Sequence, residues 1–592
     1  MEKLVLLRES MRRDNVSACI IADADPHNSE YPSEYYRARS WLSGFKGSNG
    51  LLLVMQERAG LWTDSRYFLE AEAVLHSTGI ELFRMGEQGV PSWQDWLAEH
   101  VVAGDTVAAD ASCMSLAAWT ELADRLDKKD CRLADKDYIS PIWTDRPPLV
   151  FTDVWELPEN AAGESSVARI KKVRRLVYEH DAVGFILSSL DEICWLLNIR
   201  AMDIAYNPLA SSFLIVRNND SLLFIKHEKL DSTLVEKLKN TGIMLFDYYE
   251  FFELVGKQKG LLLADFYKTP ASVRKHISPD AELKHAESPV ALLKARKNTT
   301  EIENMRQTLI ADSRALVKFA MWLESEWEKG STITEQDAAK KLEYFRNLDE
   351  RFICHSFAPI VGFAAHGAIV HYNTLSSPIS DMKGDGLLLV DSGGHYKWGT
   401  TDITRVFLKG RAEKQAIFDY TAVLKAHINL ARAVFPVGLS GQHIDILARG
   451  ELARLGLSYG HGTGHGVGYL LSVHEGPSSI RTDGAGHALM PGMILSNEPG
   501  LYRKDLWGIR LENLVLVKQS TANEFGSFLE LETLTLFPFE PALVDFSMLR
   551  EEEKDWLSSY HKTILKTLDS ILEKEENAWL SKKCMPFIKL TV

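Results

Sequence analysis

The stretch LLLVDSGGHYKWGTTDITR, residues 387–405, decides how the C-terminal part of the chain is expected to fold. Its apolar start reads as a strand that ends at Asp391, and its glycines permit a return toward Asp402. If the turn is centred on Tyr396 and Lys397, the two aspartates lie opposite each other on antiparallel strands, with Cβ atoms about 4.5–5.5 Å apart. Two carboxylates that close repel each other, so the stretch predicts a cation between them.

A second pair of acidic residues repeats this pattern further along the chain. Residues 494–496 read as a strand, a Pro-Gly pair breaks it, and residues 508–513 return toward an apolar segment. An antiparallel pairing of these strands would bring Glu498 close to Glu512. A single acidic residue is ordinarily a solvated surface charge, but four of them at the ends of apolar strands are hard to explain in that way.

The glycine-rich segment HGTGHGVG, residues 461–468, supplies imidazoles. Alternating glycines oppose a helix, and in an extended segment His461 and His465 point to the same face. A nucleotide-binding glycine loop is the rival interpretation. It is disfavoured because no clear strand precedes the segment and no acidic residue is placed to contact a ribose.

Together these residues predict a centre for two divalent metal ions, and paired metals indicate hydrolytic chemistry. The expected ligands are Asp391, Asp402, His465, Glu498 and Glu512, with Thr401 and Thr404 orienting the aspartates. Oxygen ligands with a single nitrogen and no thiolate favour manganese over structural zinc. Cobalt or zinc could occupy the same site in vitro.

The composition is that of a globular protein, with 45% apolar and 25% charged residues. A net charge of −14 argues against nucleic acid as a partner. Six scattered cysteines indicate neither a disulfide framework nor a zinc finger, and suit a reducing cytosol. No apolar run has the length of a membrane span, and the charged start reads as an amphipathic helix with Leu4, Leu7 and Met11 inward. A cytoplasmic protein without a membrane partner is therefore expected.

Strand-like and helical patterns alternate along the 592 residues, which predicts an α/β (α+β) fold class with several domains. Paired prolines mark a first linker at residues 142–148, and a second boundary is expected near Lys297. There, Thr300 and Glu303 would form the capping box of a helix that reaches about Trp327. The expected domains are 1–143, 144–297 and 298–592, the last with a helical extension over about 545–592.

The first two of these domains have a similar size and alternation, which suggests that they are related to each other. The apolar side of the C-terminal extension either packs on its own domain or forms a dimer contact.

Six short motifs in the last third of the chain resemble those of a known family. They are HYN at 371–373, DSGG…TTDITR at 391–405, HGTGHGVG at 461–468, VHEGP at 473–477, SNEPG at 496–500 and GIRLEN at 508–513. Together they resemble the Xaa-Pro aminopeptidases (aminopeptidase P) of the pita-bread metallopeptidases, and especially their long, three-domain cytosolic type. SGFKGSNG at 43–50 and WTDSRYF at 62–68 resemble the first domain of these enzymes, so the likeness covers nearly the whole chain.

The resemblance implies two creatinase-like α/β domains followed by a pita-bread catalytic domain. It implies a metalloaminopeptidase, commonly a homodimer, that hydrolyses the N-terminal bond of peptides with proline in second position. Asp402 and Glu512 would bridge the two ions, while Asp391 would hold one ion and His465 with Glu498 the other. The implied catalytic residues are His371, His461, His474 and Glu498, and the implied substrate-binding residues are Arg66, His371 and His474.

Three departures from the common motifs, Asn49, Ser472 and Leu501, touch none of the expected ligands. Three other functions remain open at this point. A prolidase would cleave Xaa-Pro dipeptides only, and a creatinase-like amidinohydrolase would need no metal. A non-enzymatic scaffold of the same fold would be expected to have lost the ligands.

Overall fold

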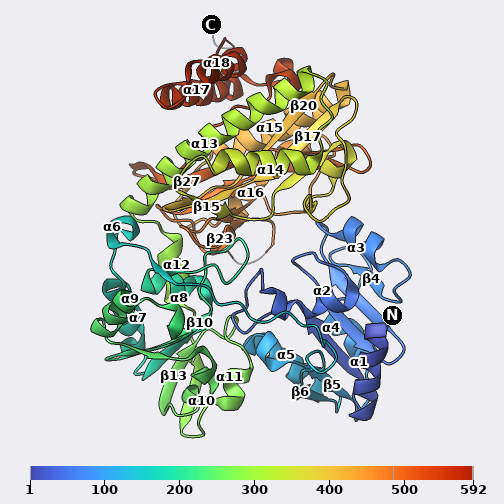
Figure 1. The fold of residues 1–592 in the computed structure, drawn as a ribbon, viewed down its shortest axis with the longest axis vertical. Helices are drawn as coiled ribbons and strands as arrows, with labels where there is room; N and C mark the ends of the chain where they lie inside the picture. Colours follow the sequence, from blue (N-terminus) through green and yellow to red (C-terminus); the bar gives the residue numbers. More distant parts are fainter. Residues whose placement is uncertain (1, 484–485, 590–592) are drawn as a thin grey trace. The chain divides into compact units, whose positions relative to one another are not determined.

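The computed structural model describes residues 2–483 and 486–589. Its contacts group the chain into two compact units. The first comprises Met1–Glu159 and Glu164–Val290, and the second comprises Asn160–Gly163 and Ala291–Val592 (Figure 1). None of the helices within the described ranges combines the length and apolar character that crossing a membrane requires.

The first unit contains two six-stranded sheets that share one topology, in the orders β4-β3-β2-β1-β5-β6 and β12-β11-β10-β8-β13-β14 (Figure 1). In the first sheet, β1 pairs antiparallel with β2 and β2 with β3, whereas the pairs β3–β4, β1–β5 and β5–β6 are parallel. The second sheet repeats this pattern, with β8–β10 and β10–β11 antiparallel and β11–β12, β8–β13 and β13–β14 parallel. This shared order supports the expected relationship between the two segments. The strands of the first sheet are β1 (Ala18–Ala22), β2 (Leu51–Met55), β3 (Ala59–Thr63), β4 (Glu81–Arg84), β5 (Thr106–Ala109) and β6 (Arg132–Asp135). Those of the second are β8 (Gly184–Leu187), β10 (Ser212–Arg217), β11 (Ser221–Ile225), β12 (Ile243–Phe246), β13 (Gly260–Ala264) and β14 (Ala281–His285).

Helices accompany both sheets of this unit. The main ones are α1 (Glu2–Arg13), α2 (Ala38–Ser43), α3 (Phe68–Leu75), α4 (Trp93–His100), α5 (Leu116–Asp127), α7 (Ser166–Glu179), α8 (Leu190–Leu197) and α9 (Ser232–Asn240). The first helix buries Leu4, Leu7 and Met11, as its spacing predicts. These side chains join the apolar core beneath the first sheet.

The second unit is built from several small sheets and longer helices. Its sheets have the orders β15-β18-β19, β16-β17-β20, β21-β28-β27-β24-β22-β23 and β25-β26. The strands are β15 (Phe352–His355), β16 (Ile360–Phe363), β17 (Gly386–Ser392), β18 (Gly394–Tyr396), β19 (Gly399–Thr400), β20 (Ile403–Lys409), β21 (Val434–Pro436), β22 (Gly464–Gly466), β23 (Glu475–Ile480), β24 (Ile494–Asn497), β25 (Gly500–Arg503), β26 (Trp507–Arg510), β27 (Asn513–Asn523) and β28 (Gly526–Thr533). The helices are α13 (Thr299–Glu328), α14 (Glu335–Arg346), α15 (Lys414–Ala431), α16 (Gly441–Ala453), α17 (Glu551–Leu568) and α18 (Lys574–Ile588).

The long helix α13 starts earlier than its predicted capping box. Asn298 is the N-cap and exchanges hydrogen bonds with Glu301, so the prediction of Thr300 and Glu303 is wrong by two residues. An asparagine at the N-cap with a glutamate three positions on satisfies two free backbone N–H groups at once. The same signal was present in the sequence, two positions before the pair that was chosen.

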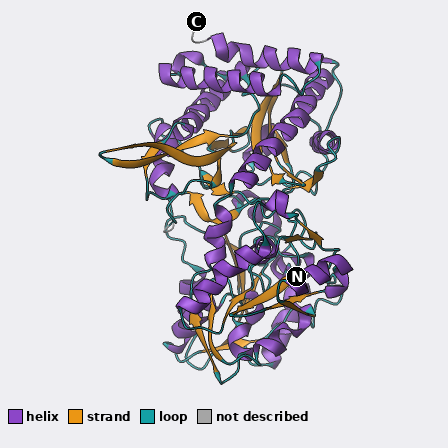
Figure 2. Cartoon of the chain, turned by 90° about the vertical axis from the view of Figure 1, so that its left-hand side faces the viewer, coloured by secondary structure: helices purple, strands orange, loops and turns teal. Residues whose placement is uncertain are grey.

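The C-terminal extension forms two helices, α17 and α18, next to the C-terminal end (Figure 2). Its apolar residues, among them Leu557, Ile564 and Leu580, are buried in the core of the same unit. The extension therefore packs on its own domain.

Candidate active site

The strands β17 and β20 carry the first carboxylate pair, but their register differs from the expected one. Asp391 lies opposite Thr404, not opposite Asp402, because the hairpin turns at Lys397 and Trp398. The predicted turn at Tyr396 and Lys397 is thus wrong by one residue. Close packing inside the hairpin favours the observed register, since a Cβ atom on Gly393 would lie 2.0 Å from the carbonyl oxygen of Thr401.

The strands β24 and β27 carry the second carboxylate pair in the expected antiparallel arrangement. Asn497 pairs with Asn513, so Glu498 and Glu512 follow at the next opposed position. The strand β22 approaches β24 closely, because a Cβ atom on Gly464 would lie 2.0 Å from the carbonyl oxygen of Ser496. Only glycine permits this approach, which places His465 beside the glutamates.

Three of the expected ligands converge on one point. Ligand atoms of Asp402, His465 and Glu512 all lie within 4.8 Å of one another. The Nε2 atom of His465 is 3.4 Å from Oδ2 of Asp402 and 3.6 Å from Oε1 of Glu498. Asp391 joins the cluster through Arg510, whose guanidinium is 2.5 Å from Oδ2 of Asp391.

Backbone and hydroxyl groups hold the ligand side chains in place. The Oγ1 of Thr404 donates to Glu512 at 2.7 Å, and the Oγ of Ser496 donates to Glu498 at 3.2 Å. The other predicted orienting residue, Thr401, donates instead to Asp312 at 3.0 Å. The prediction that both threonines orient the aspartates is therefore wrong in its partners. Thr404 donates its hydrogen bond to a glutamate, and Thr401 donates to a buried aspartate of α13.

Burial and mutual repulsion raise the pKa values of three carboxyl groups of the cluster, those of Asp391, Glu498 and Glu512. Burial raises the pKa of Asp391 to about 6, although Arg510 acts against the rise. The pKa of Glu512 lies well above its usual range because of burial and the nearby Asp402 and Glu498. Burial disfavours the charged form of His465, yet Asp402 and Glu498 outweigh it and raise the pKa of His465 to about 9. Such a cluster retains its charges only when positive charge is supplied.

The donor set fits divalent metal ions. The Oδ1 atom of Asp391 is buried and makes no hydrogen bond, so a carboxylate oxygen is left with ligand capacity. Four carboxylates and one imidazole nitrogen form a mostly oxygen donor set of the kind that hard divalent ions prefer. The residues that could hold such ions are Asp391, Asp402, His465, Glu498 and Glu512.

The three predicted histidines lie around this cluster. The ring of His474 meets the ring of His465 edge-on, with centroids 4.3 Å apart. The Nε2 atom of His461 is 2.8 Å from the hydroxyl of Tyr502. His371 is half-buried, and the carbonyl of the preceding residue accepts a hydrogen bond from Arg510 at 3.4 Å.

Arg510 and Tyr502 are site residues that the sequence reasoning missed. Arg510 donates to Asp391 and, at 2.7 Å, to the Tyr502 hydroxyl, which in turn can donate to His461. The signal was available, because Arg510 stands two positions before Glu512 in the GIRLEN motif. The remaining predicted residue, Arg66, belongs to the first unit, where its guanidinium pairs with Asp64 at 2.7 Å.

The chain matches four sequence models of protein families. Metallopeptidase family M24 matches residues 303–519, and the C-terminal region of that peptidase matches 527–587. Two matches to the creatinase/prolidase N-terminal domain cover residues 3–140 and 145–301. Together the four matches account for nearly the whole chain.

Several proteins that are similar over nearly the whole chain are named aminopeptidases. A probable Xaa-Pro aminopeptidase P of Laccaria bicolor is 36% identical over 604 residues, which covers 99% of this chain and 93% of the relative. Aminopeptidase P2 of Arabidopsis thaliana is 36% identical, over 99% of this chain and 89% of the relative. The crystal structure of an X-prolyl aminopeptidase from Caenorhabditis elegans, a cytosolic enzyme with a di-nuclear active site, superposes with a TM-score of 0.94. That structure is 33% identical, over 98% of this chain and 99% of its own.

These matches show that the chain belongs to metallopeptidase family M24. Within that family, its similarity over nearly the full length places it with the Xaa-Pro aminopeptidase P proteins. The resemblance drawn from the six motifs is confirmed. So is the expected α/β (α+β) class, with two creatinase-type domains ahead of a pita-bread domain.

Proposed function

We propose that this protein is an Xaa-Pro aminopeptidase, which removes the first residue from peptides with proline in second position. Its similarity to the Xaa-Pro aminopeptidase P proteins extends over 99% of the chain. The observation that carries the proposal is the convergence of Asp402, His465 and Glu512, whose ligand atoms lie within 4.8 Å of one another in a buried cluster. A scaffold without activity would have no need of this costly arrangement.

We further propose the metal ligands. Asp402 and Glu512 would bridge two divalent ions, Asp391 would bind one of them, and His465 with Glu498 would bind the other. The oxygen-rich donor set favours manganese. When bound, the two ions would supply a water molecule that loses its proton near neutral pH and becomes the nucleophile.

The residues of the chain would then do the rest of the work. Glu498 would accept a proton and return it to the leaving nitrogen of proline. His474 would donate a hydrogen bond to the carbonyl oxygen as negative charge develops on it. His371 and His461 would shape the space for the proline ring and the peptide beyond it. The nitrogen of an Xaa-Pro bond carries no hydrogen, so proline would be selected by shape.

A comparison of substrates tests this function. Purified protein loaded with Mn²⁺ is expected to release free arginine from an Arg-Pro-Pro peptide and to lose this activity when a chelator removes the metal. Metal content would be measured on the same sample. Cleavage of an Arg-Pro dipeptide without cleavage of the longer peptide would instead identify a prolidase. No cleavage of either peptide by fully loaded protein would contradict the proposal.

Three further proposals concern the location of the protein, its assembly and its domain limits. We expect a cytoplasmic protein, because the similar enzyme of Caenorhabditis elegans is cytosolic. We expect a homodimer in which Arg66 reaches the substrate of the neighbouring subunit. Sedimentation of the purified protein, and the KM of an Arg66→Ala variant in the dimer, would test these two expectations. The domain limits 1–143, 144–297 and 298–592 could be tested by limited proteolysis.

A further inference from the structure

A buried ion pair lies behind the hairpin that carries Asp391 and Asp402. Asp312 on α13 is 2% exposed, and Arg346 at the end of α14 is fully buried. The two side chains make a bidentate contact, with Nε of Arg346 2.8 Å from one carboxylate oxygen and NH2 3.2 Å from the other. Neither helix contributes a residue to the candidate active site.

The pair makes four contacts with the hairpin. Asp312 accepts hydrogen bonds from the Tyr396 hydroxyl at 2.8 Å and from Thr401 Oγ1 at 3.0 Å. Arg346 donates to the Ser392 hydroxyl and to the Gly393 carbonyl, both at 3.2 Å.

The position of these contacts in the sequence is informative. Ser392 directly follows Asp391, and Thr401 directly precedes Asp402. The residue next to each aspartate is thus tied by its hydroxyl to the same ion pair. Thr401 is held further by its Oγ1, which accepts from Gly394 N at 2.9 Å, and by its carbonyl, which accepts from Ser356 Oγ at 2.9 Å.

A buried ion pair is a poor way to increase stability alone. The cost of removing both charges from water often exceeds their attraction, and well-packed apolar residues commonly serve as well or better. An ion pair can instead fix the positions of its neighbours, because each hydrogen bond constrains the atoms that it joins. Asp312 and Arg346 direct all their spare hydrogen bonds at the hairpin.

We propose that Asp312 and Arg346 are positioning residues that set the separation of Asp391 and Asp402 for metal binding. The inference rests on the ligand set proposed above. The pair would pre-organise two ligands from helices that reach the site only through the hairpin. Loss of the pair should therefore weaken metal binding even where the fold remains stable.

The decisive variant replaces both charges at once. In Asp312→Leu/Arg346→Met, no charge is left unpaired, so the melting temperature of the metal-stripped protein should fall only by what the four lost hydrogen bonds to the hairpin cost. The dissociation constant for Mn²⁺, measured by calorimetric titration of stripped protein, should rise by about tenfold or more, as for other supports of metal ligands. Amide hydrogen exchange over residues 391–402 should become faster in the stripped variant.

A milder variant covers the case in which the double variant does not fold. Tyr396→Phe removes one hydroxyl donor to Asp312 and leaves the ring in place. It should raise the dissociation constant for Mn²⁺ by roughly two- to fivefold, in keeping with the loss of one hydrogen bond.

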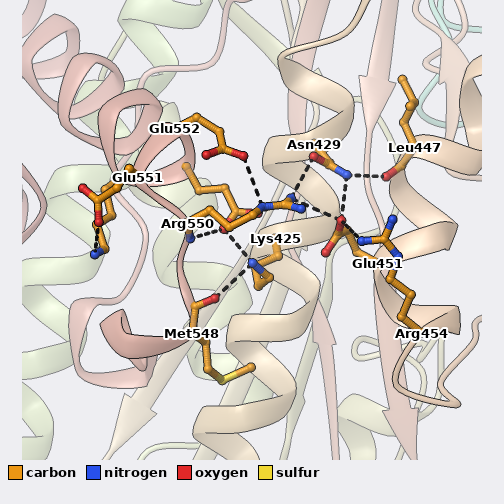
Figure 3. Close-up of polar contacts among 11 residues, drawn as sticks. Lys425, Asn429, Leu447, Glu451, Arg454, Met548, Arg550, Glu551 and Glu552 are labelled. Carbon is orange, nitrogen blue, oxygen red and sulfur yellow. Dashed lines mark hydrogen bonds and ion pairs between the residues drawn. The ribbon is translucent and has the colours of Figure 1, made fainter.

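A partly buried ion pair of the same unit provides the control. The Nζ atom of Lys425 on α15 is 2.6 Å from a carboxylate oxygen of Glu553 on α17. Figure 3 shows Lys425 in the polar network around Arg550. Glu553→Gln should lower the melting temperature and leave the Mn²⁺ dissociation constant within about twofold of the wild type.

The possible results separate this inference from the proposed function. Unchanged Mn²⁺ affinity in both the double variant and Tyr396→Phe would overturn the positioning role. So would an equal loss of affinity in Glu553→Gln. Asp402→Asn tests the ligand set itself: if it binds Mn²⁺ as tightly as the wild type, the ligand assignment fails and the inference fails with it. If only Asp402→Asn loses metal, the ligand set stands and the inference alone is wrong.

Discussion

The aspartate pair and the glutamate pair of the site are held in place by different means. Glu498 directly follows β24 and Glu512 directly precedes β27, so the antiparallel register of these two strands brings them close. Asp391 and Asp402 are not opposed, because the hairpin places Thr404 opposite Asp391. Their placement depends on the tight turn and on residues behind the hairpin. Regular backbone pairing thus supplies half of the centre, and side-chain contacts supply the other half.

The largest expected effect comes from breaking the glutamate pair. Glu498→Ala should lower kcat by at least about a thousandfold and release metal, since it removes both a proposed ligand and the proposed proton carrier. Steady-state kinetics with metal analysis of the same sample would show this. An exposed glutamate at the tip of the β27–β28 hairpin, Glu524, provides the control, because Glu524→Ala should change neither value. Retained activity with full metal content in Glu498→Ala would contradict the assignment.

A variant of His474 tests whether a histidine next to the glutamate pair stabilises the transition state. The His474 ring meets the ring of His465 edge-on, with centroids 4.3 Å apart. His474→Ala should keep the metal and lose kcat by about a hundredfold to a thousandfold, as when an oxyanion donor is removed. The split between kcat and KM is the deciding measurement. An effect on KM alone would mean that the residue binds substrate and does not act on the developing charge.

A variant of Gly464 tests whether the close approach of β22 to β24 is needed to keep His465 beside the two glutamates. In Gly464→Ala the added methyl group would meet the Ser496 carbonyl at 2.0 Å, so β22 must move away from β24. We expect a loss of about 1–3 kcal/mol in the free energy of unfolding, measured with urea. Gly450→Ala on α16, where an added Cβ meets nothing within 4 Å, should be neutral or stabilising. Equal stability of the two variants would show that the close approach is unimportant.

The smallest expected effect is on the pH dependence of stability without metal. Burial raises the pKa of Asp391 to about 6, so between about pH 4 and pH 6 the folded protein holds a proton that the unfolded chain has lost. Stability of the stripped protein should therefore fall as pH rises through this window. His465, with its pKa raised to about 9 by Asp402 and Glu498, extends the fall to higher pH.

Melting temperatures of stripped and Mn²⁺-loaded protein, compared from about pH 4.5 to pH 8, would measure this. The gap between them should widen by several degrees as pH increases. A Glu512→Gln variant, with one fewer buried acid, should lose stability less steeply when stripped. A gap that stays constant across the window would contradict the expected coupling.

Sequence reasoning succeeded where short-range pattern determines structure. Apolar strands interrupted by Pro-Gly were sufficient to predict the pairing that brings Glu498 near Glu512. The apolar spacing of the first helix was sufficient to identify its buried face. The resemblance of the motifs was sufficient to predict the family and, with it, the order of the three domains.

One failure was caused by contact between residues far apart in the chain. Nothing within residues 391–405 reveals that the Thr401 hydroxyl bonds to Asp312, 89 positions away. The turn was misplaced because the hairpin contains no residue pair, such as Asn-Gly, that would mark its centre. The misplaced cap of α13 is different, since Asn298 and Glu301 were visible as a stronger pair.

The shared strand order of the two N-terminal sheets has a consequence for the history of the chain. Six strands joined in the same order, with the same sequence of parallel and antiparallel neighbours, are what tandem duplication of one ancestral gene segment would leave. After such an event, either copy can accumulate substitutions while the hydrogen bonds between its strands preserve the strand order. The common origin of the two domains then remains visible in their strand order after their sequences have diverged.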